Sequence, residues 1–88
     1  MNEITVHVTD EDITEGFPLN GTKCAIAHAI KREQIDCTSV AVCASVIYVS
    51  FGHEIGFYYQ LPETATEFIQ KYDSGLPVEP FKFTARIP

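Results

Sequence analysis

The chain has 88 residues, enough for one domain, and 45% of them are hydrophobic, so we expect a folded domain rather than a disordered chain. Twelve acidic residues against six basic ones give a formal net charge of −6. This charge disfavours direct binding to nucleic acid or to an anionic membrane, because phosphate groups require a basic surface. With three irregularly spaced cysteines, no apolar run long enough to cross a bilayer and no signal peptide, the sequence predicts an intracellular protein with reduced thiols.

The N-terminal third predicts a strand followed by helix. Apolar and polar residues alternate over 3–9, which indicates a half-buried strand. Residues 9–15 are predicted to form a short helical turn that Thr9 or Asp10 caps. A first full helix is predicted at about 21–34, where alanines give high helix propensity.

The middle of the chain is rich in β-branched and aromatic residues and predicts three strands, at about 38–43, 46–51 and 55–61. A three-residue loop, Gly52-His53-Glu54, would join the last two strands. The register that this loop sets separates six apolar or aromatic side chains from the remaining ones, whereas a one-residue slip would mix the two faces. The predicted pairs are Phe51–Ile55, Val49–Phe57, Ile47–Tyr59, Tyr48–Tyr58 and Ser50–Gly56.

The C-terminal third predicts a helix and a last strand. Pro62 suits the first helical position and Gly75 suits the C-terminal stop of this helix. Residues 81–87 alternate again, so the element order is β-α-β-β-β-α-β in one domain spanning 1–88. The predicted fold is α+β, with a mostly antiparallel sheet of four or five strands and two helices on one face. The residues expected on the other, open face are Thr5, His7, Tyr48, Tyr58, Lys82, Thr84 and Arg86.

Cys24 and His28 lie one helical turn apart, which raises the question of a thiolate–imidazole pair or half of a metal site. Zinc requires three or four ligands at suitable spacing, and a cysteine nucleophile requires an oxyanion site and an orienting group. The sequence supplies neither, so we interpret the pair as a buried thiol and a half-buried imidazole in the core. Without a phosphate loop, a nucleophile elbow or an HExxH pattern, we expect no enzyme, metal or cofactor. The further ligands considered are Cys37, Cys43, His7 and His53.

Two surfaces are candidates for binding a partner. The first is the N-terminal segment, because the first twenty residues hold five acids and no base. Its D-x-D triplet lacks the remaining ligands of a calcium loop. We therefore interpret these acids as a solvated, helix-capping acidic patch. The second surface is the open face of the sheet, because tyrosine and arginine are typical interface anchors. The predicted partner-binding residues are Asp10, Glu11, Asp12, Glu15, Tyr48 and Tyr58.

Two segments resemble a group of short uncharacterised bacteriophage proteins. "CAIAHAI" resembles the pattern C-P-I-A-x-A-hydrophobic, and "LPETATEFIQKYDSGLPVEPFKF" resembles an L-P-x-x-A-x-x-F-I-x-x-F/Y-D-x-G-x-P-V-x-P-F-x-F ending. The likeness covers the first helix and the C-terminal third. It implies a phage origin, a location in the host cytoplasm and, at His28, a packed position, because the group has an apolar residue there.

From the resemblance and the surfaces together we expect a non-enzymatic binding protein that inhibits a host protein, such as a defence-system component of the CRISPR type or another. Its partner would be a host protein with a basic surface of the kind that holds nucleic acid, and the chain itself a monomer or small homo-oligomer. The alternative is an oligomeric binder that sequesters a signalling nucleotide across a subunit interface. The residues for that ligand would be Tyr48, Tyr58, Lys82 and Arg86.

Overall fold

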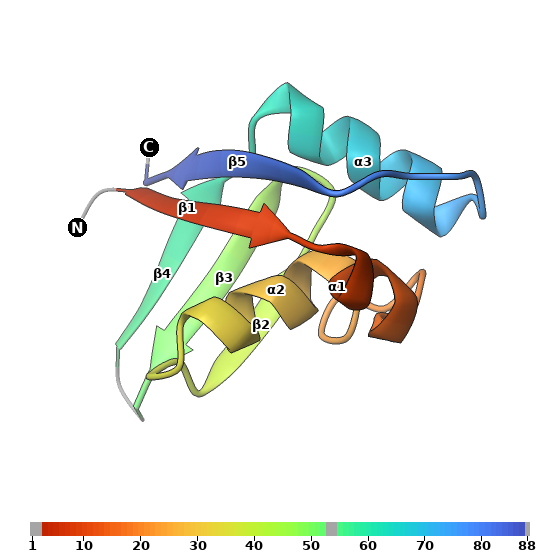
Figure 1. The fold of residues 1–88 in the computed structure, drawn as a ribbon. Helices are drawn as coiled ribbons and strands as arrows, with labels where there is room; N and C mark the ends of the chain where they lie inside the picture. The colour runs from red at the N-terminus through yellow and green to blue at the C-terminus, as the bar shows by residue number, and fades with distance from the viewer. Residues whose placement is uncertain (1–2, 53–54, 88) are drawn as a thin grey trace.

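Strands and helices alternate along the chain in the computed structural model, which describes residues 3–52 and 55–87 (Figure 1). Within these residues the fold is α+β, in the order β1-α1-α2-β2-β3-β4-α3-β5. None of their helices has both the length and the apolar composition that a bilayer crossing requires. The strands are β1 (Glu3–Val8), β2 (Ser39–Val42), β3 (Val46–Phe51), β4 (Ile55–Gln60) and β5 (Phe81–Arg86), and the helices are α1 (Asp10–Glu15), α2 (Ala25–Glu33) and α3 (Glu63–Asp73).

The strands form one antiparallel sheet in the order β1-β5-β4-β3-β2, so the first and last strands of the chain are neighbours. The register predicted for β3 and β4 is confirmed at all five predicted pairs. The loop predicted between these strands falls partly on His53 and Glu54, which lie outside the described residues. Segregation of apolar and polar side chains therefore determined the pairing, as expected when one face of a sheet is buried.

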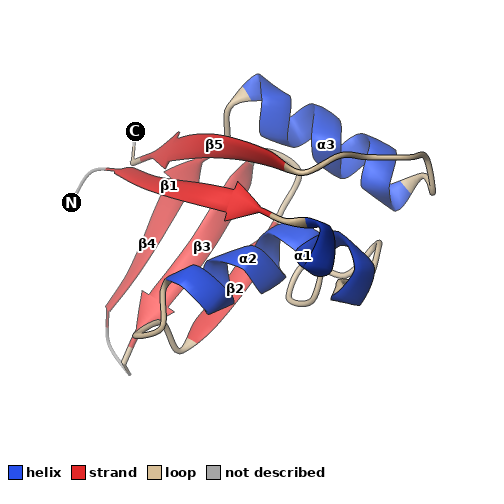
Figure 2. Cartoon of the chain, in the orientation of Figure 1, coloured by secondary structure: helices blue, strands red, loops and turns tan. Residues whose placement is uncertain are grey.

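Helices α2 and α3 cover the same face of the sheet and share one hydrophobic core with it. Helix α2 packs against β1 and β2, and its Ile26 and Ile30 are fully buried. Helix α3 lies beside the segment that leads into β5 (Figure 2), and its Phe68 stacks on Phe81, the first residue of β5, with ring centroids 4.7 Å apart. The opposite face carries the polar and tyrosine side chains that the sequence predicts there.

The N-terminal helices differ from the prediction in two ways. Residues 10–15 form a complete short helix, and the following helix begins at Ala25 rather than near residue 21. The side-chain oxygen of Asn20 accepts hydrogen bonds from the backbone N–H groups of Thr22 and Lys23. Such local bonds stabilise a turn in competition with helix, so the helix starts later.

The sheet is curled, and among the described residues β4 and β5 pair at one position, Gln60 opposite Arg86. Beyond that point β4 gives way to α3 at Pro62, whose ring lacks the N–H that a further sheet bond would need. The two strands diverge from there (Figure 1). The open face is therefore divided into a β1–β5 part and a β2–β3–β4 part.

Candidate functional site

Asp12 is buried, and the prediction that it belongs to a solvated acidic patch is wrong. Its side chain has 0% exposure. Thr9 and Asp12 form a capping box, in which the Asp12 carboxylate accepts the Thr9 backbone N–H at 2.8 Å. This reciprocal bond turns the carboxylate back toward the helix start and into the protein. A Thr-x-x-Asp spacing ahead of a helix is the sequence signal that points to this geometry.

Two cationic or titratable side chains of α2 meet the buried carboxylate. Arg32 Nη2 lies 2.9 Å from Asp12 Oδ2, and His28 Nδ1 lies 2.6 Å from Asp12 Oδ1. Arg32 Nη2 also donates to the backbone carbonyl of His7 at 2.8 Å. Burial alone would raise the pKa of Asp12, but the hydrogen bonds from Arg32, Thr9 and His28 outweigh it and hold this pKa well below its usual value. The cluster therefore ties α1, α2 and β1 together through one charged centre.

The contacts of the His28 ring within this cluster bear on whether it could activate a nucleophile. Its ring binds Asp12 on one side and approaches Glu15 on the other, with 3.6 Å between Nε2 and Oε1. A nucleophilic triad needs a hydroxyl or thiol where Glu15 stands. Cys24 touches His28 through a backbone bond, from the His28 N–H to the Cys24 carbonyl. The half-buried imidazole thus lies between two carboxylates of α1, and its packing role stays a prediction.

Cys24 immediately precedes α2 and is 7% exposed. Burial raises the pKa of its thiol, so the side chain is a neutral thiol at physiological pH. Among the residues that the structure describes, no three His, Cys, Asp or Glu side chains gather as metal ligands would. His53, one of the ligands considered from the sequence, lies outside those residues.

Replacing Cys24 by alanine is expected to lower the free energy of unfolding by about 1–2 kcal/mol, because a small core side chain is trimmed. Urea unfolding followed by circular dichroism measures this change. The matched control is Cys43→Ala, since Cys43 is exposed and its loss is expected to be nearly neutral. Stoichiometric zinc in the purified protein that disappears in the Cys24 variant would contradict a packing role.

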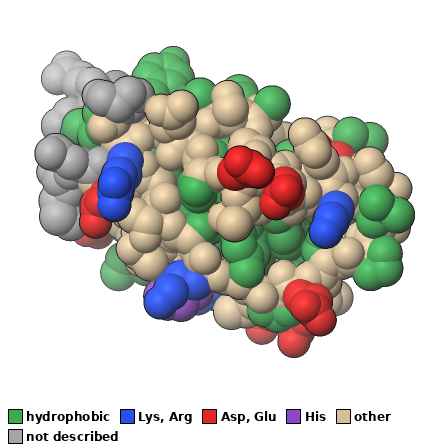
Figure 3. Space-filling view, turned by 90° about the horizontal axis from the view of Figure 1, so that it is seen from above, with side chains coloured by type: hydrophobic (Ala, Val, Ile, Leu, Met, Phe, Trp, Pro, Cys, Tyr) green, Lys and Arg blue, Asp and Glu red, His purple; other side chains and the backbone are tan. Residues whose placement is uncertain are grey.

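The acidic segment that remains on the surface is smaller than predicted. Asp10 and Glu11 are exposed in the first turn of α1, and Glu15 is exposed at its end. Figure 3 shows acidic and basic side chains interspersed with apolar ones on the face seen from above. The exposed acids of α1 can steer a basic partner, but Asp12 cannot contact one.

Tyr48 and Tyr58 lie opposite each other on β3 and β4, with ring centroids 4.7 Å apart. Tyr58 is 63% exposed, whereas Tyr48 is half-buried. Tyr48 lies over Gly56, and any side chain at position 56 would overlap its ring. The glycine therefore leaves room for a flat aromatic surface beside the exposed tyrosine.

The residues predicted to hold a nucleotide across a subunit interface are partly brought together within one chain. Arg86 is engaged by Glu3, with 2.9 Å between Nε and Oε2. Lys82 lies four residues away on the same strand, which corresponds to about 13 Å, and faces His7 on β1. Arg86 is opposite Gln60, which lies on the same face of β4 as Tyr58, so Arg86 is a diagonal neighbour of the tyrosine pair, whereas Lys82 lies farther along β5.

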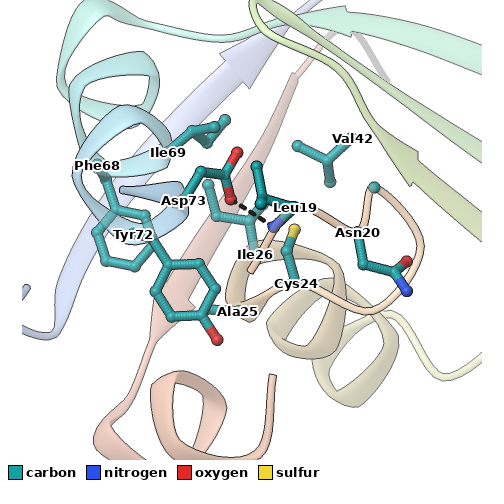
Figure 4. A pocket seen from close by; sticks show the side chains of 11 residues that line it. Leu19, Asn20, Cys24, Ala25, Ile26, Val42, Phe68, Ile69, Tyr72 and Asp73 are labelled. Carbon is teal, nitrogen blue, oxygen red and sulfur yellow. Dashed lines mark hydrogen bonds between the residues drawn. The ribbon is translucent and has the colours of Figure 1, made fainter. Parts of the chain in front are cut away.

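A cavity that the sequence analysis missed lies between α2, α3, β2 and the loop over residues 16–24 (Figure 4). Its volume is about 270 Å³. The loop approaches its neighbours closely at Gly16, beside Ala25, and at Gly21, beside Val42. In the sequence, the pair of glycines in this loop is the one feature that indicates such a close approach and the cavity beneath it. The walls are made by Leu19, Asn20, Gly21, Cys24, Ala25, Ile26, Val42, Phe68, Ile69, Tyr72 and Asp73.

No protein-family model, curated protein or solved structure matches this chain. The fold and the contacts above therefore carry the functional argument. The phage origin implied by the two motifs stays a prediction.

Proposed function

We propose that this chain is a non-enzymatic protein-binding domain that accepts an extended strand of its partner along β4. The observation that carries the proposal is the pairing of β4. It pairs with β3 from Ile55 to Gln60, yet in the described chain it meets β5 only at Gln60. We call the side of β4 that faces away from β3, over 56–59, the β4 edge.

Hydrogen-bond geometry identifies the groups on the β4 edge. The Leu61 N–H donates to the Ser45 carbonyl, which makes this position a hydrogen-bonded pair between the two strands. Because such pairs alternate in antiparallel sheets, Gly56 and Tyr58 direct their N–H and C=O groups away from β3. An antiparallel partner strand can therefore form up to four backbone hydrogen bonds there, the mode known as strand addition.

The two outermost strands are covered by side chains or a loop, whereas none of the hydrogen bonds among the described residues covers the β4 edge in this way. On β1, the backbone of His7 donates its N–H to Glu33 and accepts a bond from Arg32. On β2, the outward N–H of Val42 donates to the Gly21 carbonyl. Covering an outer strand with side chains or a loop blocks the pairing of another chain. The protection of β1 and β2 favours β4 as the docking strand.

Aromatic side chains flank the β4 edge on both faces. Tyr58 is 63% exposed on the outer face, and Phe57 is 36% exposed on the inner face. Backbone bonds in strand addition supply affinity, whereas alternate side chains supply specificity. Exposed aromatic residues contribute large contact area at low entropic cost, so the partner strand should carry apolar residues that meet them.

The partner proposed here is a host protein with a basic surface, and the domain would act in the host cytoplasm as its inhibitor. The resemblance to phage proteins and the net charge of −6 support this part of the proposal. The exposed acids Asp10 and Glu11 would speed association by steering rather than form the central contact.

Tyr58 of the β4 edge and its cross-strand neighbour Tyr48 on β3 provide the test. Tyr48→Ser combined with Tyr58→Ser is expected to weaken the affinity for the partner by about 30-fold or more, the loss of a hot spot. The partner is first isolated from bacterial lysate, identified by mass spectrometry and purified. Surface plasmon resonance then measures its affinity for each variant.

The matched control is Phe17→Ser, which removes an aromatic residue of similar exposure, 59%, from the 16–24 loop. We expect it to change the affinity by less than about threefold, as for a residue outside the central contact. A second variant, Tyr58→Pro, removes an N–H from the β4 edge without touching the bonds to β3. Unchanged affinity in both tyrosine variants would exclude β4 as the docking strand.

A further inference from the structure

We infer that the cavity beneath the 16–24 loop binds a small aromatic amine, with its ring among the apolar walls and its ammonium group at Asp73. This site is separate from the β4 edge. Figure 4 shows Phe68, Ile69 and Tyr72 of α3 on one side, Cys24 and Ile26 by the start of α2, and Leu19 beside Asp73, to which its backbone is hydrogen-bonded. An apolar cavity with one directed polar group is typical of small-molecule sites.

The 16–24 loop is held in place around the cavity. The Phe17 N–H donates to the Lys23 carbonyl, and the Gly21 carbonyl accepts the Val42 N–H at 2.7 Å. Leu19 is the one described residue other than glycine with a positive φ, 61°, and its side chain is 81% exposed. Its N–H donates to Asp73 Oδ1 at 2.8 Å. The loop thus forms a preformed rim rather than an open chain segment.

Asp73 supplies the charge that selects a cation. Its Oδ1 accepts the Leu19 N–H, and in the described residues no Lys, Arg or His nitrogen forms an ion pair with this carboxylate. A carboxylate has capacity for several further hydrogen bonds, and charge-assisted bonds are stronger than neutral ones. The neighbouring Cys24 is a neutral thiol, so it adds no competing charge. A primary ammonium group therefore matches the open acceptor.

The volume limits the size of the ligand. An apolar cavity of about 150 Å³ holds benzene. By proportion, the volume of about 270 Å³ accepts a ligand of about ten non-hydrogen atoms. One aromatic ring with a two-carbon arm and an amine, about nine non-hydrogen atoms, is within that limit. The arm lets the ring reach Phe68 and Tyr72 while the nitrogen stays at the rim.

The experiment uses 2-phenylethylamine as the probe and 2-phenylethanol as its uncharged analogue. Isothermal titration calorimetry measures the affinity for the full chain, and amide chemical shifts in NMR report where the probe binds. We expect saturable binding of the amine, shifts at Leu19, Cys24 and Asp73, and binding of the alcohol weaker by at least about tenfold, the usual gain from a charge-assisted bond.

Three variants distinguish binding of the amine in the cavity from its general electrostatic attraction to an acidic protein. Asp73→Asn keeps an acceptor for the Leu19 N–H but removes the charge, and should weaken amine binding by at least about tenfold. Val42→Phe fills the cavity from β2 and should abolish binding of both probes. The matched control is Glu63→Gln, which removes the same charge from the same helix outside the cavity, and should leave binding unchanged.

Folding of each variant is checked by circular dichroism before titration, and Asp73→Asn alone suffices if Val42→Phe fails to fold. Absence of saturable amine binding to the wild-type chain would overturn the inference. So would equal binding of amine and alcohol, or amine binding that survives Asp73→Asn. Equal weakening by Glu63→Gln would show attraction to the net charge and would also overturn it.

Discussion

Replacing Asp12 by alanine is expected to destabilise the fold by about 3 kcal/mol, because it removes the capping box and the charge-assisted hydrogen bonds to the partly exposed Arg32 and His28. A loss of this size is a large fraction of the stability of a small domain. Urea unfolding followed by circular dichroism measures it. The matched control is Asp10→Ala, two residues earlier on α1, where the side chain is exposed. The control should cost less than about 1 kcal/mol, the size of a helix-dipole contact, and equal effects at the two positions would contradict the burial of Asp12.

The pH dependence of the stability that Asp12 contributes follows from the lowered pKa of its carboxyl group. The folded pKa lies below that of the unfolded chain, so the contribution to stability is complete above the unfolded value, near 4. It is lost as the pH falls from there toward the lower folded pKa. We therefore expect the stability gap between wild type and Asp12→Asn to be constant from about pH 7 to pH 5 and to narrow below pH 4. A gap that widens on acidification would contradict this assignment.

A double variant tests whether the fold requires the charges of Asp12 and Arg32 or only well-packed side chains at these two positions. Replacing Asp12 by leucine and Arg32 by methionine removes both charges together. Apolar replacements of a buried ion pair are often neutral or stabilising, whereas removal of one partner is not. We expect the double variant to be more stable than Asp12→Ala by about 2 kcal/mol or more, measured by the same unfolding curves.

Replacing Ile30 by alanine is the second large effect, with an expected loss of about 2–5 kcal/mol. Ile30 is fully buried on α2, where it faces the sheet and shares the core with α3. The lost transfer free energy and the cavity left behind both contribute. For a domain of this size each 1 kcal/mol lowers the melting temperature by roughly 4–8 °C, which thermal unfolding measures.

The chain offers a matched control for this variant five residues later. Ile35 follows α2 and is 83% exposed. Ile35→Ala removes the same atoms from the surface and should change the free energy of unfolding by less than about 0.5 kcal/mol. Similar losses at positions 30 and 35 would contradict the orientation of α2 on the sheet.

The sequence by itself determined the parts of this protein that depend on local pattern. Strict alternation placed β1 and β5, and the clean separation of side chains specified the pairing of β3 with β4 down to single residues. The position of α3 followed from Pro62 and Gly75 at its ends. These features rest on steric and hydrophobic preferences that act over a few neighbouring residues, which a single sequence displays.

Tertiary structure decided the features on which the two proposals depend and completed the charged cluster at Asp12. Asp12 is one of several acids in sequence, and Arg32 from α2 completes the buried centre that the capping box of α1 begins. The β4 edge lies opposite positions beyond the described end of β5 at Arg86, and this offset between the two strands is not visible in the pattern of either strand. The cavity at Asp73 joins residues up to 54 positions apart, Leu19 and Asp73. These sites form because segments that are distant in sequence come together and become buried. A local sequence pattern does not show which distant segments will meet.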